Sequence, residues 1–295
     1  MKEALDKLAS IEGQESWVLP TRNVIGFGSE EEVFDALISV RPIRFIKVSE
    51  GAELSYSVVE RCHKIGTEVI CSEYVTIIGP WHKVSLSVRA LLFPGKKTWG
   101  ITLDKNITGG FFDEIAPLCD TLIFDSELTK DVPAGAVIDL NWMRLAPIRE
   151  ELRYLTDMAI SHDKNSKIIG VKVYDSAPSS WLMAGWICNK LKVEPESGKK
   201  VANGVSVKSK EFTLDLVESN DTRILLEFKG KDAKIGQLTV GEGLITLEYS
   251  HEARKRVYLK RSRKELCLEY DAFGAPTGSY NESVKLGREI LEYAS

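Results

Sequence analysis

The chain has 295 residues, of which 43% are hydrophobic and 28% charged, with a net charge of −4 at neutral pH. This is the length and composition of a globular protein with room for two ordinary domains. No stretch approaches the roughly 20 apolar residues of a membrane span, and the first residues do not form a signal peptide, so we expect no membrane partner.

The first half of the chain predicts a mixed α/β domain. Asn23–Gly28 is typical of a strand that runs into a helix, with Ser29 and Glu32 as a capping box, and Ile43–Val48 is a second strand. This β-α-β opening favours parallel pairing. Further strands are predicted at Leu54–His63, Glu68–Ile77, Thr98–Leu103 and Thr121–Phe124, and helices at Trp81–Phe93 and Phe111–Leu118.

Gly26 and Gly28, next to a helix N-terminus, are a pattern that can hold phosphate. However, the third glycine of a dinucleotide fingerprint is absent, and the carboxylates of Glu30, Glu31 and Glu32 would repel a pyrophosphate. A plain turn is the better interpretation.

Two cysteines lie on the arms of a predicted hairpin whose loop is Lys64–Thr67, with Gly66 at positive φ. This register places Cys62 opposite Val69 and Cys71 opposite Glu60, so the cysteines are diagonal, about 7–8 Å apart, which is long for a disulfide. Two thiols and His63 on opposite pleats also fall short of a metal site. We therefore expect free thiols in the core, with a redox role for Cys62 and Cys71 as the alternative. Five scattered cysteines, an odd number, favour a reducing compartment and a cytoplasmic location.

The second half predicts an α+β domain with a largely antiparallel sheet. The polar break Lys164–Lys167 is the expected boundary, giving domains 1–163 and 164–295 with charge balances of −8 and +4. After a strand at Ile168–Tyr174, a helix at Trp181–Leu191 and a linker at Glu194–Lys200, alternating patterns indicate repeated strands. These are Phe212–Val217, Ile224–Phe228, Leu244–Tyr249, Val257–Lys260 and Leu266–Tyr270, followed by a final helix that carries Val284, Leu286, Ile290 and Leu291.

The most informative segment is Asp139–Arg149, which predicts a strand end, a short loop and a helix with Pro147 in its first turn. Trp142, Arg144 and Arg149 crowd the entrance of that helix. An indole with two guanidiniums suits either a stacked structural corner or a contact surface for another molecule. Both interpretations stay open at this point.

This segment, Asp-Leu-Asn-Trp-Met-Arg-Leu-Ala-Pro-Ile-Arg, resembles the signature of the OpcA family of glucose-6-phosphate dehydrogenase assembly proteins and allosteric effectors. Val69–Ile77, Val88–Pro94 followed by Trp99, and Ser180–Leu191 resemble further family segments in the same order. The chain departs from the family at Ile148, where a tryptophan is usual, and at Trp99-Gly100, where paired tryptophans are usual. The resemblance implies a non-catalytic protein, without a cofactor, that binds glucose-6-phosphate dehydrogenase.

The sequence carries no catalytic or metal-binding constellation that we recognise: the four histidines are scattered, and there is no nucleophile elbow, zinc motif or P-loop lysine. Seven basic residues at 254–264 form either a solvated hairpin face or a positive patch for an acidic partner. Nucleic acid is disfavoured because no aromatic stacking platform accompanies the charge. The predicted partner contacts are Trp99, Trp142, Arg144, Arg149, Arg254, Lys255, Arg256 and Lys260. The alternative function is a phosphosugar enzyme or binding protein that uses the Asp139–Arg149 corner.

Overall fold

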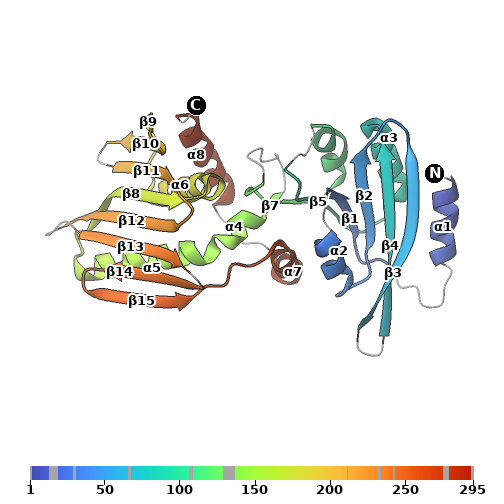
Figure 1. The fold of residues 1–295 in the computed structure, drawn as a ribbon, viewed down its shortest axis with the longest axis horizontal. Helices are drawn as coiled ribbons and strands as arrows, with labels where there is room; N and C mark the ends of the chain where they lie inside the picture. The colour runs from blue at the N-terminus through green and yellow to red at the C-terminus, as the bar shows by residue number, and fades with distance from the viewer. Residues whose placement is uncertain are drawn as a thin grey trace. The chain divides into compact units, whose positions relative to one another are not determined.

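The computed structural model describes residues 2–12, 19–28, 31–65, 68–105, 109–128, 137–210, 212–230, 234–241, 243–274 and 279–293. The chain forms two compact units (Figure 1): unit 1 contains residues 1–140 and 262–275, and unit 2 contains residues 141–261 and 276–295. This division differs from the predicted boundary between residues 163 and 164. The helix that precedes that boundary belongs to unit 2, because its Leu155 packs on Gly236 in the sheet of that unit.

Unit 1 is built on a seven-stranded sheet in the order β3-β4-β2-β1-β5-β6-β7. Only the pair β3–β4 is antiparallel. Without β3, the strands taken in chain order lie in the order 3-2-1-4-5-6, which is the doubly wound Rossmann arrangement. The strands are β1 (Asn23–Phe27), β2 (Arg44–Glu50), β3 (Ser55–Ile65), β4 (Glu68–Gly79), β5 (Thr98–Thr102), β6 (Thr121–Phe124) and β7 (Val137–Asp139).

Both faces of this sheet are buried, as expected for parallel strands. On one face Ile25, Ile46 and Val75 form a core with Val84 and Val88. On the other face an aromatic cluster of Phe34, Phe45 and Tyr74 is packed with ring centroids 4.5–5.1 Å apart. The helical segments of the unit are α1 (Lys2–Glu12), α2 (Glu31–Ile38), α3 (Trp81–Leu91), η1 (Phe111–Ile115), η2 (Ala116–Leu118) and α7 (Arg263–Phe273).

Unit 2 is built on an eight-stranded sheet in the order β15-β14-β13-β12-β8-β11-β10-β9. Its pairs are antiparallel except β8–β11, which confirms the predicted largely antiparallel sheet. The strands are β8 (Lys167–Asp175), β9 (Ser197–Val201), β10 (Gly204–Ser209), β11 (Phe212–Glu218), β12 (Thr222–Lys229), β13 (Lys234–Gly241), β14 (Leu244–Tyr249) and β15 (Glu252–Val257). The helices are α5 (Ala146–His162), α6 (Ala177–Leu191) and α8 (Tyr280–Glu292), and the short α4 (Leu140–Arg144) begins at the last residue of the first part of unit 1.

Several predicted elements differ from the structure. Leu266–Tyr270 is not a strand but part of α7, because the Ser262 hydroxyl accepts a hydrogen bond from the Glu265 amide and the Glu265 carboxylate accepts one from the Ser262 amide. A strand was predicted at Val257–Lys260, but the observed strand β15 comes earlier and ends at Val257. The predicted linker Glu194–Lys200 includes the start of β9, and the prediction missed β10 and β13. Ser29 and Gly66 lie outside the described residues.

Candidate functional site

The Rossmann order of unit 1 identifies the crevice where a dinucleotide would bind, at the carboxyl ends of β1 and β5. β1 ends at Phe27, and the next residue, Gly28, has φ +93°. A Cβ added at Gly28 would lie 2.7 Å from Cβ of Asp104, which follows β5. The carboxylate of Asp104 therefore occupies the space beside the backbone of Gly28, where a Rossmann protein holds the pyrophosphate.

The residues of this crevice do not fit a dinucleotide. The first turn of α2 carries Glu31 and Glu32, whose negative charge opposes an anion at a helix N-terminus. Phe27 packs against Trp81 at 5.7 Å and Phe111 at 5.4 Å between ring centroids, so its ring belongs to the core. Together with the acidic residues, this geometry supports the predicted interpretation of Gly26–Gly28 as a turn.

The Asp139–Arg149 segment forms a buried corner in the part that belongs to unit 2. The guanidinium carbon of Arg149 lies 3.6 Å from the centre of the Trp142 ring, and its Nη1 donates a hydrogen bond of 2.8 Å to the Trp142 carbonyl. The Trp142 ring also meets Tyr280 of α8 edge-on at 5.3 Å. The indole is thus enclosed by a cation on one side and an aromatic ring on another.

Arg144 belongs to the same corner. Its Nη1 donates to Oδ1 of Asn141 at 3.4 Å, and this oxygen also accepts a hydrogen bond of 3.2 Å from the Ser179 hydroxyl. Trp142, Arg144 and Arg149 are 3%, 5% and 7% exposed. Side chains buried to this degree contact a partner only after being displaced. The geometry therefore favours the structural corner over the contact surface for these three residues.

Trp99 is also buried, at 4% exposure, on β5 of unit 1. The guanidinium of Arg22 lies 3.4 Å from the centre of its ring, and Tyr270 of α7 packs against it at 5.0 Å. Asp271 forms salt bridges with both Arg22 and Arg41. Burial lowers the pKa of Arg22, and the carboxylate of Asp271 opposes that shift. Trp99 thus holds α7 on the sheet of unit 1.

The predicted basic patch is divided between the two faces of β15. Arg256 donates hydrogen bonds to Glu151 at 2.9 Å and to Glu150 at 3.0 Å. Both bonds raise the pKa of Arg256, and the bond to Glu151 has the larger effect. Arg254 lies 3.8 Å from the Glu151 carboxylate. Lys255 points to the other face of the strand, because successive strand side chains alternate. All four side chains, Lys260 included, are exposed, but the two arginines pair with carboxylates of α5.

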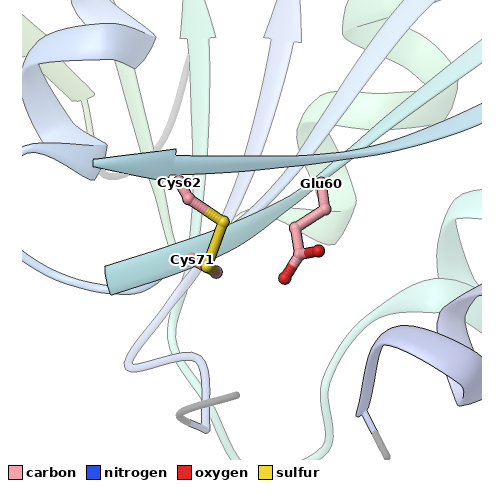
Figure 2. Close-up of side chains that lie close together, drawn as sticks. All are labelled: Glu60, Cys62 and Cys71. Carbon is pink, nitrogen blue, oxygen red and sulfur yellow. A yellow bond between two sulfur atoms is a disulfide. The ribbon is translucent and has the colours of Figure 1, made fainter. Parts of the chain in front are cut away.

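Cys62 and Cys71 form a disulfide, contrary to the prediction of free thiols. The strands pair as far as Ile65 and Glu68, so Cys62 lies directly opposite Cys71 instead of diagonally. The loop is shorter than predicted, which changes every pairing along the hairpin. Glu60, two residues before Cys62, lies on the same face (Figure 2). The sequence pattern predicted no role for Glu60, although the two-residue spacing of Glu60 from Cys62 was an available signal.

Two further ion pairs each lie within one unit. Arg263 donates to the buried Asp125 at 2.8 Å, and His162 lies 3.2 Å from Glu252. Within the described ranges, the only group of three or more His, Cys, Asp or Glu side chains that converges within ligand distance is Glu60, Cys62 and Cys71.

Two cavities lie in unit 2. One of about 190 Å³ is lined by residues of α5, α6, β8 and β12, including Leu152, Trp186 and Lys190. The other, of about 400 Å³, has Lys167, Lys192 and Glu196 among its lining residues. Neither of these two cavities is lined by a residue of the segment 139–149. In the described residues we find no helix with the length and apolar character needed to span a bilayer.

The fold defines a two-unit α/β protein with a Rossmann-type unit, and the described residues of its crevice oppose the binding of a dinucleotide. Residues 135–271 match the family described as the C-terminal domain of a glucose-6-phosphate dehydrogenase subunit. This match over the second half of the chain confirms the resemblance of the Asp139–Arg149 segment to the OpcA family.

Similar solved structures include a glucose-6-phosphate 1-dehydrogenase from Mycobacterium avium, with 8% identity, a TM-score of 0.49, and coverage of 94% of this chain and 93% of that one. A biliverdin reductase from Synechocystis sp. PCC 6803, in complex with biliverdin and NADP+, has 9% identity, a TM-score of 0.46, and coverage of 94% and 98%. Likenesses at these scores carry no conclusion about activity. No curated protein matches the chain.

Proposed function

We propose that this chain is a non-catalytic cytoplasmic protein that binds glucose-6-phosphate dehydrogenase and promotes its assembly or allosteric activation. It would thereby control entry into the oxidative pentose phosphate pathway. The observation that carries the proposal is the match of residues 135–271 to a domain named for a subunit of that dehydrogenase.

The crevice of unit 1 supports a non-catalytic role. A dehydrogenase must hold its nicotinamide cofactor at the switch point of the sheet, where this chain places Asp104, Glu31 and Glu32. A binding protein has no such need and can fill the crevice with its own side chains. An effector acts instead by binding one conformation of the enzyme more tightly than another, because equal affinity shifts no equilibrium.

Lys255 and Lys260 of the basic segment are the candidates for the first contact with the partner. Lys255 and Lys260 are exposed, and positive charges at an exposed edge mainly accelerate association with an acidic surface. The buried residues among the eight predicted contacts would first have to be displaced, whereas these two lysines lie where a partner can reach them. We assign the early, charge-driven encounter to this edge of unit 2.

The test combines the purified chain with the dehydrogenase of the same source. We expect a complex in size-exclusion chromatography and a change in kcat/KM or in the oligomeric state of the enzyme. The chain alone should show no oxidation of glucose 6-phosphate with either nicotinamide cofactor. Absence of a complex, or turnover that survives removal of contaminating dehydrogenase, would show that the proposal is wrong.

A further inference from the structure

The hairpin β3–β4 brings three potential metal ligands together on one face (Figure 2). Cys62 is directly opposite Cys71, and Glu60 lies two residues before Cys62 on the same strand. One carboxylate oxygen of Glu60 and the two sulfur atoms all lie within 4.8 Å of one another. Cys62 is exposed, Glu60 is partly buried and Cys71 is buried, so solvent reaches the cluster at Cys62.

The carboxylate of Glu60 supplies an independent observation. Its Oε1 atom is buried and accepts no hydrogen bond from any described residue. Buried polar atoms are nearly always paired. An unpaired carboxylate oxygen beside two sulfur atoms therefore indicates that a positively charged partner is missing. The adjacent arginines do not supply it: Arg44 pairs with Glu73, and Arg61 stacks on Tyr74 and Phe34 on the opposite face of the hairpin.

We propose that the reduced form of this cluster binds one soft divalent metal ion of the Zn²⁺ type. The ligands are the thiolates of Cys62 and Cys71 and the carboxylate of Glu60. Two thiolates select Zn²⁺ over hard ions such as Mg²⁺ and Ca²⁺, and zinc sites with three protein ligands keep a water in the fourth position. Metal binding at this hairpin does not require the dehydrogenase.

The reduced side chains are close enough for this coordination. Bonds of about 2.3 Å to a tetrahedral Zn²⁺ place two sulfur atoms roughly 3.8 Å apart. Directly opposite residues of an antiparallel pair have their Cβ atoms about 4.5–5.5 Å apart, so two thiolates reach a common ion by small side-chain rotations. Glu60 needs no change of strand register, because it already lies beside the sulfur atoms.

Reduction must precede binding, because both sulfur atoms are committed to the disulfide in this structure. A dithiol reductant gives two electrons and two protons to the Cys62–Cys71 bond, which breaks into two thiols while the reductant becomes a disulfide. The metal ion then displaces the two thiol protons and binds the thiolates. Oxidation by a disulfide reverses the sequence and releases the ion. The site is therefore available only to the reduced chain.

The experiment uses the full chain, reduced, freed of reductant under inert gas, and titrated with Zn²⁺ against a chromophoric chelator. We expect one high-affinity equivalent in the reduced chain and none in the oxidised chain. Co²⁺ in place of Zn²⁺ should give thiolate-to-metal charge-transfer absorption. Glu60→Gln, which preserves the hairpin, should weaken Zn²⁺ binding at least about tenfold, the scale known for perturbed metal-site residues.

The matched variants are Cys62→Ser and Cys71→Ser, which should abolish the high-affinity equivalent, and Cys119→Ser, which should retain it. Circular dichroism checks the fold of each variant, and the unmutated oxidised chain serves as a comparison that needs no mutation. The proposal is overturned if the reduced chain binds no Zn²⁺. It is also overturned if binding is unaffected by disulfide formation or by Glu60→Gln.

Discussion

The guanidinium of Arg149 is stacked 3.6 Å from the centre of the Trp142 ring and hydrogen-bonded to that residue's own carbonyl. One side chain thus fixes both the indole and the backbone of the preceding short helix. A planar guanidinium can do both at once, whereas an ammonium cannot stack in this way. This pair turns the entrance of α5 into a rigid corner.

We predict that Arg149→Ala lowers the free energy of unfolding by about 2–3 kcal/mol, from the lost charged hydrogen bond and the lost stacking. Arg149→Lys should recover less than half of the loss. Chemical denaturation measures both, with Arg153→Ala as the control, because Arg153 lies exposed on the same helix. A loss below about 0.5 kcal/mol for Arg149→Ala, the range of ordinary surface substitutions, would contradict a structural corner.

Local patterns predicted most strands and helices of this chain, because apolar spacing and turn residues act within one element. Phe212–Val217 and Thr121–Phe124 lie within or coincide with observed strands. The prediction of a strand at Leu266–Tyr270 was wrong, because a short apolar run fits the spacing of a strand as well as that of a helix. The capping box at Ser262 stabilises the helix instead.

Long-range relations could not be predicted from one sequence. The strand order of unit 1 and the return of residues 262–275 to it depend on contacts such as Arg22 with Asp271. The cysteine pairing failed for a local reason: a shorter loop moved Cys71 from diagonal to opposite. Trp99 and Trp142 are buried by residues distant in the sequence, Arg22 and Tyr280 respectively. Because these partners could not be predicted, the two tryptophans were predicted to be contacts for another protein.

A second prediction concerns the carboxylate of Glu151, which is 2% exposed and meets Arg256 and Arg254 from the edge strand β15. Arg256→Ala should destabilise the chain by about 1–2 kcal/mol, because a buried carboxylate loses a charged hydrogen bond. In the background of Glu151→Gln, the same change should cost less. A double-mutant cycle on unfolding free energies measures the coupling, and additive losses would show that the pair contributes nothing.

A third prediction separates the exposed lysines of the basic segment from the general charge of the chain. Lys255→Glu with Lys260→Glu should slow association with the dehydrogenase about tenfold or more at low salt, the scale of electrostatic steering, and the effect should fade in high salt. The control is Lys199→Glu with Lys200→Glu, the same charge change on β9 at the opposite edge of the sheet. Stopped-flow measurements decide, and equal slowing by both pairs would remove the special role of Lys255 and Lys260.

A fourth prediction follows from the buried thiols. Burial raises the pKa of Cys188 to about 12, and burial followed by the charge of Asp125 raises that of Cys267 to about 12. Their folded pKa lies above the ordinary value of 9.0, so this contribution to stability is complete below pH 9 and is lost between pH 9 and 12.

At pH 8 only roughly one thiol in ten thousand is a thiolate when the pKa is 12, so native Cys188 and Cys267 should resist alkylation. Cys62, which is exposed, should react first in the reduced chain. Mass spectrometry after timed labelling distinguishes the sites, and the unfolded chain provides the control in which every thiol reacts. Rapid native labelling of Cys267 would show that its surroundings open more readily than the packing indicates.

The last prediction tests the contact between α6 and α8 in unit 2. A Cβ added at Gly185 would lie 1.9 Å from the carbonyl oxygen of Ser283, and one at Gly287 would lie 2.7 Å from that of Trp181. The three atoms nearest to the added Cβ at Gly185 are all backbone atoms, so no rotamer change of a side chain relieves the clash. Gly185→Ala must therefore push the two helices apart.

We expect Gly185→Ala to lower the free energy of unfolding by about 3 kcal/mol, the upper part of the range for overpacking, despite the better helix propensity of alanine. Gly241→Ala is the matched control, because a Cβ at that position has no neighbour within 4 Å. Thermal and urea unfolding of the two variants are compared with the parent chain. If Gly185→Ala is as stable as Gly241→Ala, then α6 and α8 do not pack through their glycines, and α8 is held on unit 2 by its other side chains alone.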